Sequence, residues 1–478
     1  MPLNAFRKSL QGKDVVADLR AGLIGEGVQF DTAFGPQTLT YADYTASGRA
    51  LKQVEDFVAN HVLPFYANSH TESSFVGAYT SRLRESARAV IAAELNAGPD
   101  CAVIFSGSGA TSAVNRLVAL SGIAEIAKTG KPTVFIGPYE HHSNILPWRE
   151  SGAEVVEIDE APEGGPDLEM LEAELMARAD SPLLIGSFSA ASNVSGILTD
   201  ADAVTALLKR YGALAFWDYA GGAPYIPIDM NPGAGLEKDA IFLSPHKFPG
   251  GPGASGLLIV RKSAIRSKRP TWPGGGSVSY VSPWDHSYLD SVTEREEAGT
   301  PNLIGDIRAA LVFIVKAAIG QEFITKREHE LGERALTVWG KNPNLQLLGT
   351  DKPHRLPIFS FAIRDGQGGH VHHQLFTRML SDMTGVQARG GCVCAGPYGH
   401  RLLHVERAQS EKIRDAVLAG HEVEKPGWVR LNFSYLMDDA TVTRIIESVD
   451  KLAGEASDLS CQYQCDVATA HFSAQKVA

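Results

Sequence analysis

One lysine occupies a position where a catalytic amine and an ordinary solvated side chain are equally good expectations. Lys247 follows the apolar run Ala240–Leu243 and precedes the glycine-rich stretch Phe248–Gly253. A lysine after a buried strand lies at the carboxyl edge of a sheet, where α/β enzymes bind ligands. Burial there favours the neutral, nucleophilic amine that a Schiff base with an aldehyde cofactor requires. A solvated loop lysine is the alternative that Lys247 alone leaves open.

Two more polar positions end strands of the same predicted sheet. Asp218 ends the strand Leu214–Trp217, and His141 and His142 follow Thr133–Gly137. A carboxylate there can hold a protonated pyridine nitrogen and turn the ring into an electron sink, although aspartate also caps turns and helices. One imidazole could stack on a planar ring and transfer protons. No Cys or Glu lies at ligand spacing, so no metal site is expected at the histidines.

A phosphate-binding turn is expected before the first helix of this sheet. The small residues Ser106–Ser112 follow the strand Val103–Phe105. Their amides, together with the dipole of the helix, would attract an anion. The turn has neither a dinucleotide fingerprint nor a P-loop lysine, and a turn without a ligand fits equally well. Asn193, which follows another strand, could bond a ring substituent.

The elements that must position these residues follow a βαβ pattern. Between residues 100 and 262, short apolar runs alternate with amphipathic ones such as Leu168–Arg178 and Asp200–Tyr211. Seven strands are predicted, at 103–105, 133–137, 154–158, 183–188, 214–218, 240–243 and 256–260. This alternation predicts an α/β fold around a mostly parallel, buried sheet.

A chain of 478 residues is too long for one small core and is expected to divide into domains. We predict an N-terminal arm over 1–40, a large domain over 41–304, and a smaller C-terminal α+β domain over 305–455. A bridging helix over 305–342 would open the smaller domain. Residues 456–478 are predicted to form a loosely held tail.

Composition excludes several functional classes. A net charge of −11 gives no footprint for nucleic acid, and no basic run predicts binding to a membrane surface. Five cysteines without a paired framework favour a reducing compartment. No signal-peptide core or membrane-length apolar window is present in the sequence. We therefore expect a cytoplasmic protein that binds small molecules and copies of itself.

Taken together, the motifs resemble the class V aminotransferase family, and within it the cysteine desulfurase and selenocysteine lyase branch. The resemblance spans roughly residues 40–455 and rests on Glu140-His141-His142-Ser143-Asn144, Trp217-Asp218-Tyr219-Ala220, Ser244-Pro245-His246-Lys247, Gly274-Gly275-Gly276-Ser277, Glu297-Ala298-Gly299-Thr300-Pro301-Asn302 and Arg389-Gly390-Gly391-Cys392-Val393-Cys394-Ala395. It implies a fold type I transferase with a seven-stranded large domain, and pyridoxal 5'-phosphate as the cofactor.

The resemblance also implies roles at the cofactor. Lys247 would form the Schiff base, Asp218 would pair with the pyridine nitrogen, and His141 would stack on the ring and transfer protons. Thr300 would reach the phosphate in a neighbouring subunit, which implies a homodimer. Further cofactor contacts are implied for Gly109, Ala110, Thr111, Asn193, Ser244 and His246.

On the substrate side, the resemblance implies that Arg430, assisted by Arg389, binds the carboxylate of an amino acid. A planar guanidinium suits that bidentate role. Cys394 would take the sulfur of the substrate as a persulfide, since positive charge from Arg389 would favour the thiolate. A buried structural cysteine is the alternative. Cys392 is a second thiol, with a redox or spectator role.

The leading expectation is a desulfurase that releases alanine from cysteine-type substrates and passes sulfur, or selenium, to an acceptor protein. An aminotransferase, a cystine or cysteine β-lyase and an epimerase would use the same cofactor site. A sulfur-transfer scaffold without turnover is the third possibility. One position departs from the family: a glutamine usually lies three residues after the aspartate, and Gly221 stands there. The contact with the cofactor phenolate is then missing or supplied elsewhere.

Overall fold

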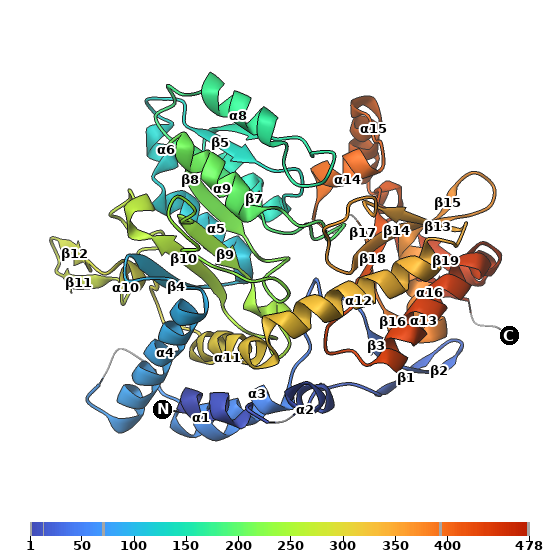
Figure 1. Ribbon diagram of the computed structural model, residues 1–478, viewed down its shortest axis with the longest axis horizontal. Helices are drawn as coiled ribbons and strands as arrows, with labels where there is room; N and C mark the ends of the chain where they lie inside the picture. Colours follow the sequence, from blue (N-terminus) through green and yellow to red (C-terminus); the bar gives the residue numbers. More distant parts are fainter. Residues whose placement is uncertain (1, 13, 69–71, 392–393, 476–478) are drawn as a thin grey trace. The chain divides into compact units, whose positions relative to one another are not determined.

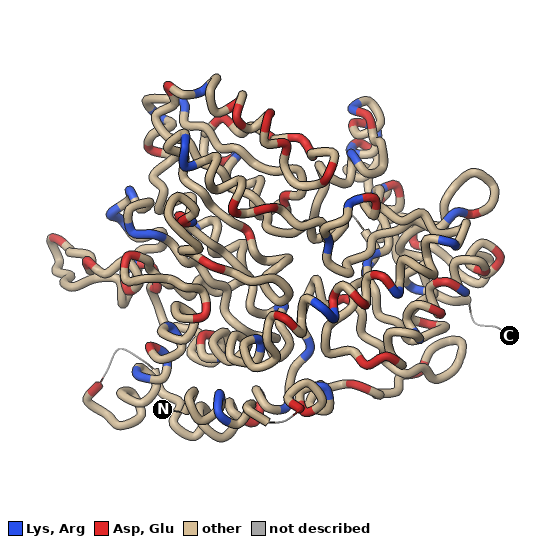
Figure 2. Tube along the Cα trace, viewed as in Figure 1, with Lys and Arg blue, Asp and Glu red and all other residues tan. Residues whose placement is uncertain are grey.

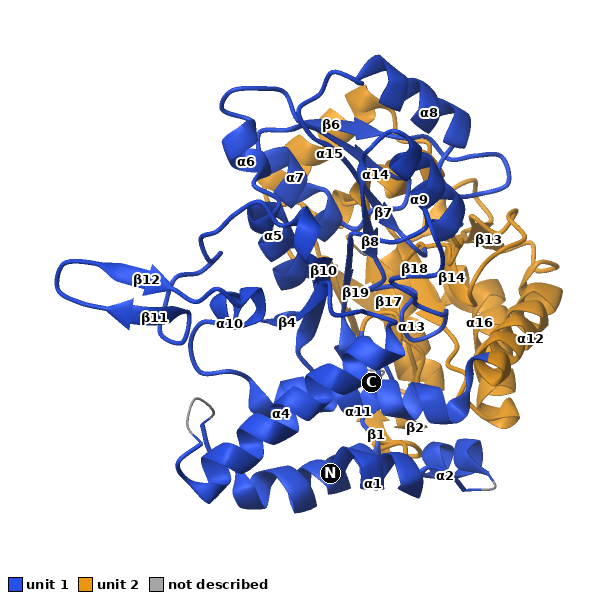
Figure 3. Ribbon diagram, turned by 60° about the vertical axis from the view of Figure 1, so that its left-hand side comes forward, with its two compact units in different colours: residues 1–22, 47–191, 199–321 blue, residues 23–46, 192–198, 322–478 orange. Residues whose placement is uncertain are grey.

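The computed structural model describes residues 2–12, 14–68, 72–391 and 394–475, which form two compact units (Figure 1). Unit 1 comprises residues 1–22, 47–191 and 199–321, and unit 2 comprises residues 23–46, 192–198 and 322–478 (Figure 3). Both units are therefore discontinuous in sequence. The predicted arm over 1–40 is shared between them, and the predicted start of the smaller domain at 305 falls inside a helix of unit 1.

Unit 1 is built on a seven-stranded sheet. The seven predicted strands are all present, as β4 (Cys101–Gly107), β5 (Thr133–Ile136), β6 (Glu154–Glu157), β7 (Leu184–Ser189), β8 (Leu214–Asp218), β9 (Ala240–Leu243) and β10 (Gly256–Arg261). Their spatial order is β4-β10-β9-β8-β7-β5-β6. Only β10 runs antiparallel to its neighbours, β4 and β9. The predicted α/β fold with a mostly parallel sheet is confirmed.

Helices cover both faces of this sheet, which explains why its strands are continuous apolar runs rather than alternating ones. Phe216 packs on one face in a cluster with Val114 and Leu117 of α5 (Gly109–Leu120). The next residue, Trp217, points to the opposite face, where its Nε1 donates to Thr205 of α9 (Ala201–Arg210) at 3.0 Å.

The other elements of unit 1 surround this sheet or extend from it. The helices are α1 (Pro2–Ser9), α2 (Val15–Ala21), α3 (Lys52–Phe57), α4 (Phe75–Glu94), α6 (Ile123–Ile126), α7 (Leu146–Glu150), α8 (Leu168–Ala177), α10 (Val292–Glu296) and α11 (Leu303–Ile319). A hairpin of β11 (Val278–Val281) and β12 (His286–Tyr288) lies between β10 and α10 in the chain.

The predicted bridging helix over 305–342 is in fact two helices. Helix α11 ends at Ile319, and α12 runs from Gln321 to Trp339. Gly320 separates them with a φ of 85°, a conformation that glycine adopts without steric strain. The apolar periodicity continues across the break, so the sequence pattern did not show it.

Unit 2 contains a five-stranded antiparallel sheet. Its strands are β13 (Leu345–Leu348), β14 (Ile358–Arg364), β18 (Trp428–Asn432) and β17 (Arg389–Gly391) in that order, with β15 (His370–Val371) also paired to β14. Beside it lie the hairpin β1 (Gln29–Thr32)–β2 (Gly35–Thr38), the parallel pair β3 (Thr40–Tyr41)–β16 (Val386–Gln387), and helices α12, α13 (His373–Thr384), α14 (Gly396–Leu402), α15 (Arg407–Leu418) and α16 (Asp439–Leu459).

The segment predicted as a loose tail is folded over most of its length. Helix α16 continues to Leu459, and β19 (Tyr463–Asp466) then pairs with β20 (His471–Ala474). Tyr463 is buried in the apolar core of unit 2. The prediction of a loose tail relied on the Ala, Ser and Gln content of the segment. It overlooked this one aromatic ring, whose burial holds the segment against unit 2.

Charged residues of both signs are interspersed along the chain (Figure 2). Within the described ranges, no helix is both long and apolar enough to cross a membrane. The same residues contain no cluster of three or more His, Cys, Asp or Glu side chains arranged to hold a metal ion.

Candidate active site

Lys247 and Asp218 lie at the carboxyl ends of neighbouring parallel strands. Asp218 is the last residue of β8, and Lys247 ends the 3-10 turn that directly follows β9. The lysine is half-buried and the aspartate is buried. Because the two strands are parallel, both side chains belong to the same edge of the sheet, and the charge of Lys247 acts on Asp218.

Two backbone segments, at Gly48 and Gly251, approach the turn that ends in Lys247 closely. The amide of Gly48 donates to the carbonyl oxygen of His246 at 2.9 Å. A Cβ at Gly48 would overlap the carbonyl of Phe248, and one at Gly251 would overlap the carbonyl of Pro245. Only glycine permits this approach, so the glycines beside Lys247 fix its backbone rather than loosen it.

Asp218 is a buried carboxyl group on whose pKa burial and its neighbours act in opposite directions. Burial raises its pKa to about 6, while a hydrogen bond from the Ala220 amide and the charge of Lys247 act in the opposite direction. Its Oδ1 accepts that amide hydrogen at 2.7 Å. A protonated ring nitrogen beside this carboxylate would stabilise the ionised form.

We predict that an Asp218→Asn substitution changes how the stability of the cofactor-free protein depends on pH. The folded-state pKa of Asp218, about 6, lies above its ordinary 3.8. Stability from this group is therefore fully present below about pH 4 and is lost as the pH rises through 6. The variant should lack that loss, which is on the order of 3 kcal/mol. Urea unfolding from pH 4 to 8 measures it, and identical pH slopes in both proteins would contradict the prediction.

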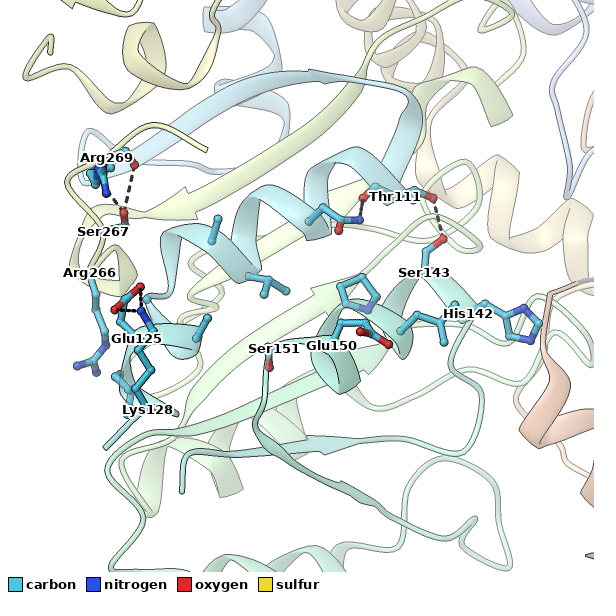
Figure 4. A pocket seen from close by; sticks show the side chains of 18 residues that line it. Thr111, Glu125, Lys128, His142, Ser143, Glu150, Ser151, Arg266, Ser267 and Arg269 are labelled. Atoms are coloured by element: carbon cyan, nitrogen blue, oxygen red, sulfur yellow. Dashed lines mark hydrogen bonds and ion pairs between the residues drawn. The ribbon is translucent and has the colours of Figure 1, made fainter. Parts of the chain in front are cut away.

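The loop after β5 orients His141. Its Nδ1 accepts the backbone amide hydrogen of Ser143 at 3.1 Å, so the neutral ring carries its proton on Nε2. The Ser143 hydroxyl also lies 2.7 Å from that of Thr111, in the first turn of α5 (Figure 4). These contacts join the predicted proton-transfer residue to the predicted phosphate turn. A cavity of about 1280 Å³ opens beside Thr111, His142 and Ser143.

The predicted phosphate residues lie together at the start of α5. The Ala110 amide donates to the Ser244 hydroxyl at 2.9 Å. Gly109 has a φ of +63°, and a Cβ there would lie 3.0 Å from both the Ser244 hydroxyl and the imidazole of His246. Burial, with the charge of Lys247, lowers the pKa of His246 to about 4. At neutral pH this imidazole is therefore an uncharged hydrogen-bonding group.

Thr300 lies on an exposed loop whose start is firmly anchored. Glu297 pairs with Arg84 at 2.6 Å and with Arg88 at 2.9 Å, and it accepts the Phe105 amide hydrogen at 2.7 Å. The next glycine, Gly299, donates to the carbonyl of Gly275 at 2.7 Å, which ties two of the quoted motifs together. Thr300 itself is exposed.

Unit 2 holds the two predicted substrate arginines as a pair. Arg389 and Arg430 are directly opposite across β17 and β18. Asp43 bonds both, with Oδ2 at 2.8 Å from the Nε of Arg389 and Oδ1 at 3.0 Å from the Nη2 of Arg430. Opposed like charges destabilise a strand pair, and this carboxylate compensates them. The Arg389 side chain is 51% exposed and that of Arg430 is 4% exposed.

Burial lowers the pKa of Arg430, while Asp43 acts to raise it. Its Nη1 donates to the carbonyl of Asn193 at 3.1 Å, and its Nε has no hydrogen-bond partner within the described part of the chain. Asn193 thus belongs to unit 2, unlike the other predicted cofactor contacts. Sequence reasoning missed Asp43. The available signal was an acidic residue between apolar ones in Tyr41-Ala42-Asp43-Tyr44.

An Asp43→Ala substitution is expected to destabilise unit 2 strongly. Removing the carboxylate leaves the buried Arg430 without its counter-charge, which costs about 3 kcal/mol or more. Urea unfolding of the holoenzyme is the measurement. Asp439, an exposed carboxylate that pairs with Arg327 and Arg334, provides the control, and Asp439→Ala should cost less than about 1 kcal/mol. Equal losses from the two variants would contradict the prediction.

Cys394 is exposed, so it is not the buried structural cysteine that the sequence left open. It has a φ of 57°, which is uncommon outside glycine, and it lies two residues before α14. Cys394 follows Arg389 by five residues, and both residues belong to unit 2 together with Arg430. Cys392 lies outside the described residues.

The residues of unit 1 fit pyridoxal phosphate. Lys247 offers an amine, Asp218 offers a buried carboxylate to the ring nitrogen, and His141 has a fixed tautomer. At the start of α5, Gly109 leaves space that a Cβ would fill against Ser244. Small residues and helix amides of this kind suit a phosphate group.

Comparison with known proteins agrees with this fit. A family model described as aminotransferase class-V matches residues 40–442. A cysteine desulfurase of Pectobacterium atrosepticum is 31% identical over 369 residues, which cover 76% of this chain and 85% of the relative. A probable cysteine desulfurase of Halalkalibacterium halodurans is 27% identical over 364 residues, covering 75% and 84%.

Among solved structures, the apo cysteine desulfurase of Thermococcus onnurineus superposes with a TM-score of 0.71 at 21% identity, covering 87% of this chain and 95% of the other. At that identity the likeness shows the fold alone, and it confirms the predicted fold type. The match over 40–442 and the relative at 31% identity show more. The chain belongs to the aminotransferase class-V family of pyridoxal phosphate-dependent enzymes.

Proposed function

We propose that this protein is a cysteine desulfurase, which removes sulfur or selenium from an L-cysteine-type substrate and releases alanine. Relatives that bear this name match three quarters of the chain. The observation that carries the reaction is the exposed thiol of Cys394, which follows Arg389 by five residues in unit 2. A transaminase or an epimerase has no need of a nucleophilic thiol.

Pyridoxal phosphate, when bound, supplies an electron sink for negative charge at the α-carbon of an amino acid. Lys247 holds the cofactor through its Nζ and moves the proton at that carbon. His141, with its proton on Nε2, donates or accepts a second proton. Asp218 holds the ring nitrogen in its protonated form.

The substrate carboxylate is assigned to Arg430 with Arg389. These two guanidiniums and the single carboxylate of Asp43 leave one net positive charge, which one substrate carboxylate neutralises. The charge balance therefore suits an amino acid with a neutral side chain.

In the sulfur step, the thiolate of Cys394 attacks the sulfur of the substrate. A sulfur–sulfur bond forms, and the bond between sulfur and the β-carbon breaks. The electron pair stays on that carbon, which takes up a proton to give alanine. The persulfide left on Cys394 then passes its outer sulfur to an acceptor thiol.

The proposal extends to the assembly. We assign Thr300 to the phosphate site of a second subunit, because it lies exposed on an anchored loop. The working form is then a cytoplasmic homodimer whose cysteine persulfide supplies an acceptor protein.

The test is product analysis of the wild-type holoenzyme with L-cysteine and a thiol reductant. We expect alanine and sulfide in equal amounts, and a single added sulfur on the peptide that contains Cys394 when the reductant is omitted. Pyruvate with ammonia would instead indicate a β-lyase, a keto acid an aminotransferase, and inverted substrate an epimerase. Each of these outcomes, or no product from any amino acid, would overturn the proposal.

A further inference from the structure

Glu140, directly before His141, is a buried carboxylate held by four uncharged donors. Its Oε1 accepts the backbone amide hydrogens of Gly137 at 3.2 Å and Ser189 at 2.8 Å. Its Oε2 accepts the Ser189 hydroxyl at 2.7 Å and the Asn144 amide at 2.5 Å. A Cβ at Gly137 would lie 3.0 Å from the carboxylate. Both oxygens are thus saturated, and the side chain has one available position.

Asn144, the side-chain amide that donates to Glu140, is itself held in place by hydrogen bonds. Asn144 is fully buried, and its Oδ1 accepts Nε1 of Trp148 at 3.1 Å and the Ser187 hydroxyl at 2.7 Å. Its backbone amide donates to the carbonyl of His141 at 2.7 Å. The turn from Glu140 to Asn144 is therefore closed around His141 by its own side chains.

The second anchor of Glu140 lies beside Asp218. Ser189, the last residue of β7, is directly opposite Asp218 on β8. The next amide, that of Ala190, donates to the Asp218 carbonyl at 2.9 Å. Glu140 thus connects the loop that bears the imidazole to the strand pair that bears the buried acid.

We propose that Glu140 is a positioning residue, which holds the His141 imidazole in a fixed relation to the Asp218 carboxylate. The inference rests on the proposed function in one respect, namely that His141 moves a proton. A turn free to shift would change the direction of Nε2, because the Ser143 amide that holds Nδ1 belongs to the same turn. Displacements of this size reduce rate without removing any reacting group.

A Glu140→Gln substitution separates this role from simple space filling. The glutamine has the same shape, and its oxygen can keep the two backbone donors. Its amide nitrogen would then face Asn144 Nδ2, donor against donor. The variant therefore breaks the link to the turn while leaving the link to the backbone of β7 intact.

The test is a kinetic double-mutant cycle in the holoenzyme with His141→Gln. We expect about a 100-fold loss of kcat from His141→Gln and about a tenfold loss from Glu140→Gln. The double variant should lie within about twofold of His141→Gln alone, since Glu140 acts through the imidazole. Circular dichroism of the visible cofactor band should show the same pattern without any substrate.

Asp239 provides the matched control. It is also a buried carboxylate of unit 1, accepting the Ala215 amide hydrogen at 2.7 Å and pairing with Lys209. Because Asp239 does not act through the imidazole, the fold loss of kcat in the double variant of Asp239→Asn and His141→Gln should equal the product of the two single losses. If Glu140→Gln and His141→Gln also multiply, to about a 1,000-fold loss, the positioning role is wrong.

Two further arms keep the test decisive. If Glu140→Gln does not fold, Ser189→Ala removes only the hydroxyl donor, and its expected loss of about threefold should vanish in the His141→Gln background. A loss that persists there overturns the proposal. If the wild-type enzyme makes no alanine from cysteine, the desulfurase proposal fails by itself, while the dichroism cycle still decides the role of Glu140.

Discussion

Replacement of Cys394 by alanine is expected to leave a folded, cofactor-bound protein that forms alanine from cysteine more than about 1,000-fold more slowly. The thiol is exposed, so its loss opens no cavity. Alanine also has a Cβ, so the positive φ at this position costs the variant no more than the wild type. The substitution therefore removes a nucleophile and little else. Alanine release under single-turnover conditions measures the effect.

Two other exposed cysteines of unit 2, Cys461 and Cys465, serve as controls for the loss of a thiol. Alanine at either position should leave turnover unchanged. Alanine formation by Cys394→Ala at the wild-type rate would remove Cys394 from the reaction and leave the lyase, epimerase and aminotransferase chemistries.

Replacement of Lys247 by alanine is expected to lower turnover by about 10⁴-fold, because one side chain both holds the cofactor and moves the α-proton. A rival amine exists in unit 1. Burial lowers the pKa of Lys316 on α11 to about 7, so part of it is neutral at physiological pH. Its Nζ, however, donates to the carbonyls of Ala223 and Ile226. We therefore expect borohydride reduction of the holoenzyme to fix the cofactor on the Lys247 peptide.

The control for charge is Lys262, an exposed lysine that donates to the carbonyl of Pro99. Lys262→Ala should retain full activity and the same visible band. Recovery of the reduced cofactor on the Lys316 peptide, or near-normal turnover by Lys247→Ala, would assign the Schiff base elsewhere.

The sheet and its edge could be predicted from the sequence because their signals are local. Each strand is a short apolar run, and a polar residue such as Asp218 or Lys247 follows where the strand ends. Parallel pairing then brings these ends to one edge, whatever the details of packing. All seven strands of the sheet in unit 1 could therefore be predicted from the sequence alone.

The residues that sequence reasoning missed act across long separations in the chain. Asp43 meets Arg389 and Arg430 from more than 300 positions away, a pairing that no local pattern encodes. Glu140 was visible in a motif, but its function depends on Ser189, 49 positions later. The break at Gly320 was hidden for the opposite reason, since helical periodicity continues on both sides of one glycine.

The discontinuity of unit 2 has a consequence for biosynthesis. Residues 23–46 leave the ribosome early, yet the partners of β3 and Asp43 lie at positions 386–430. The hairpin β1–β2 can pair within this early segment, but β3 and Asp43 have no partner until almost the whole chain is translated, whereas the sheet of unit 1 is complete at residue 261. Folding during synthesis then proceeds in a fixed order, with unit 1 first. A nascent chain stalled before residue 389 would have a formed cofactor sheet and no arginine pair.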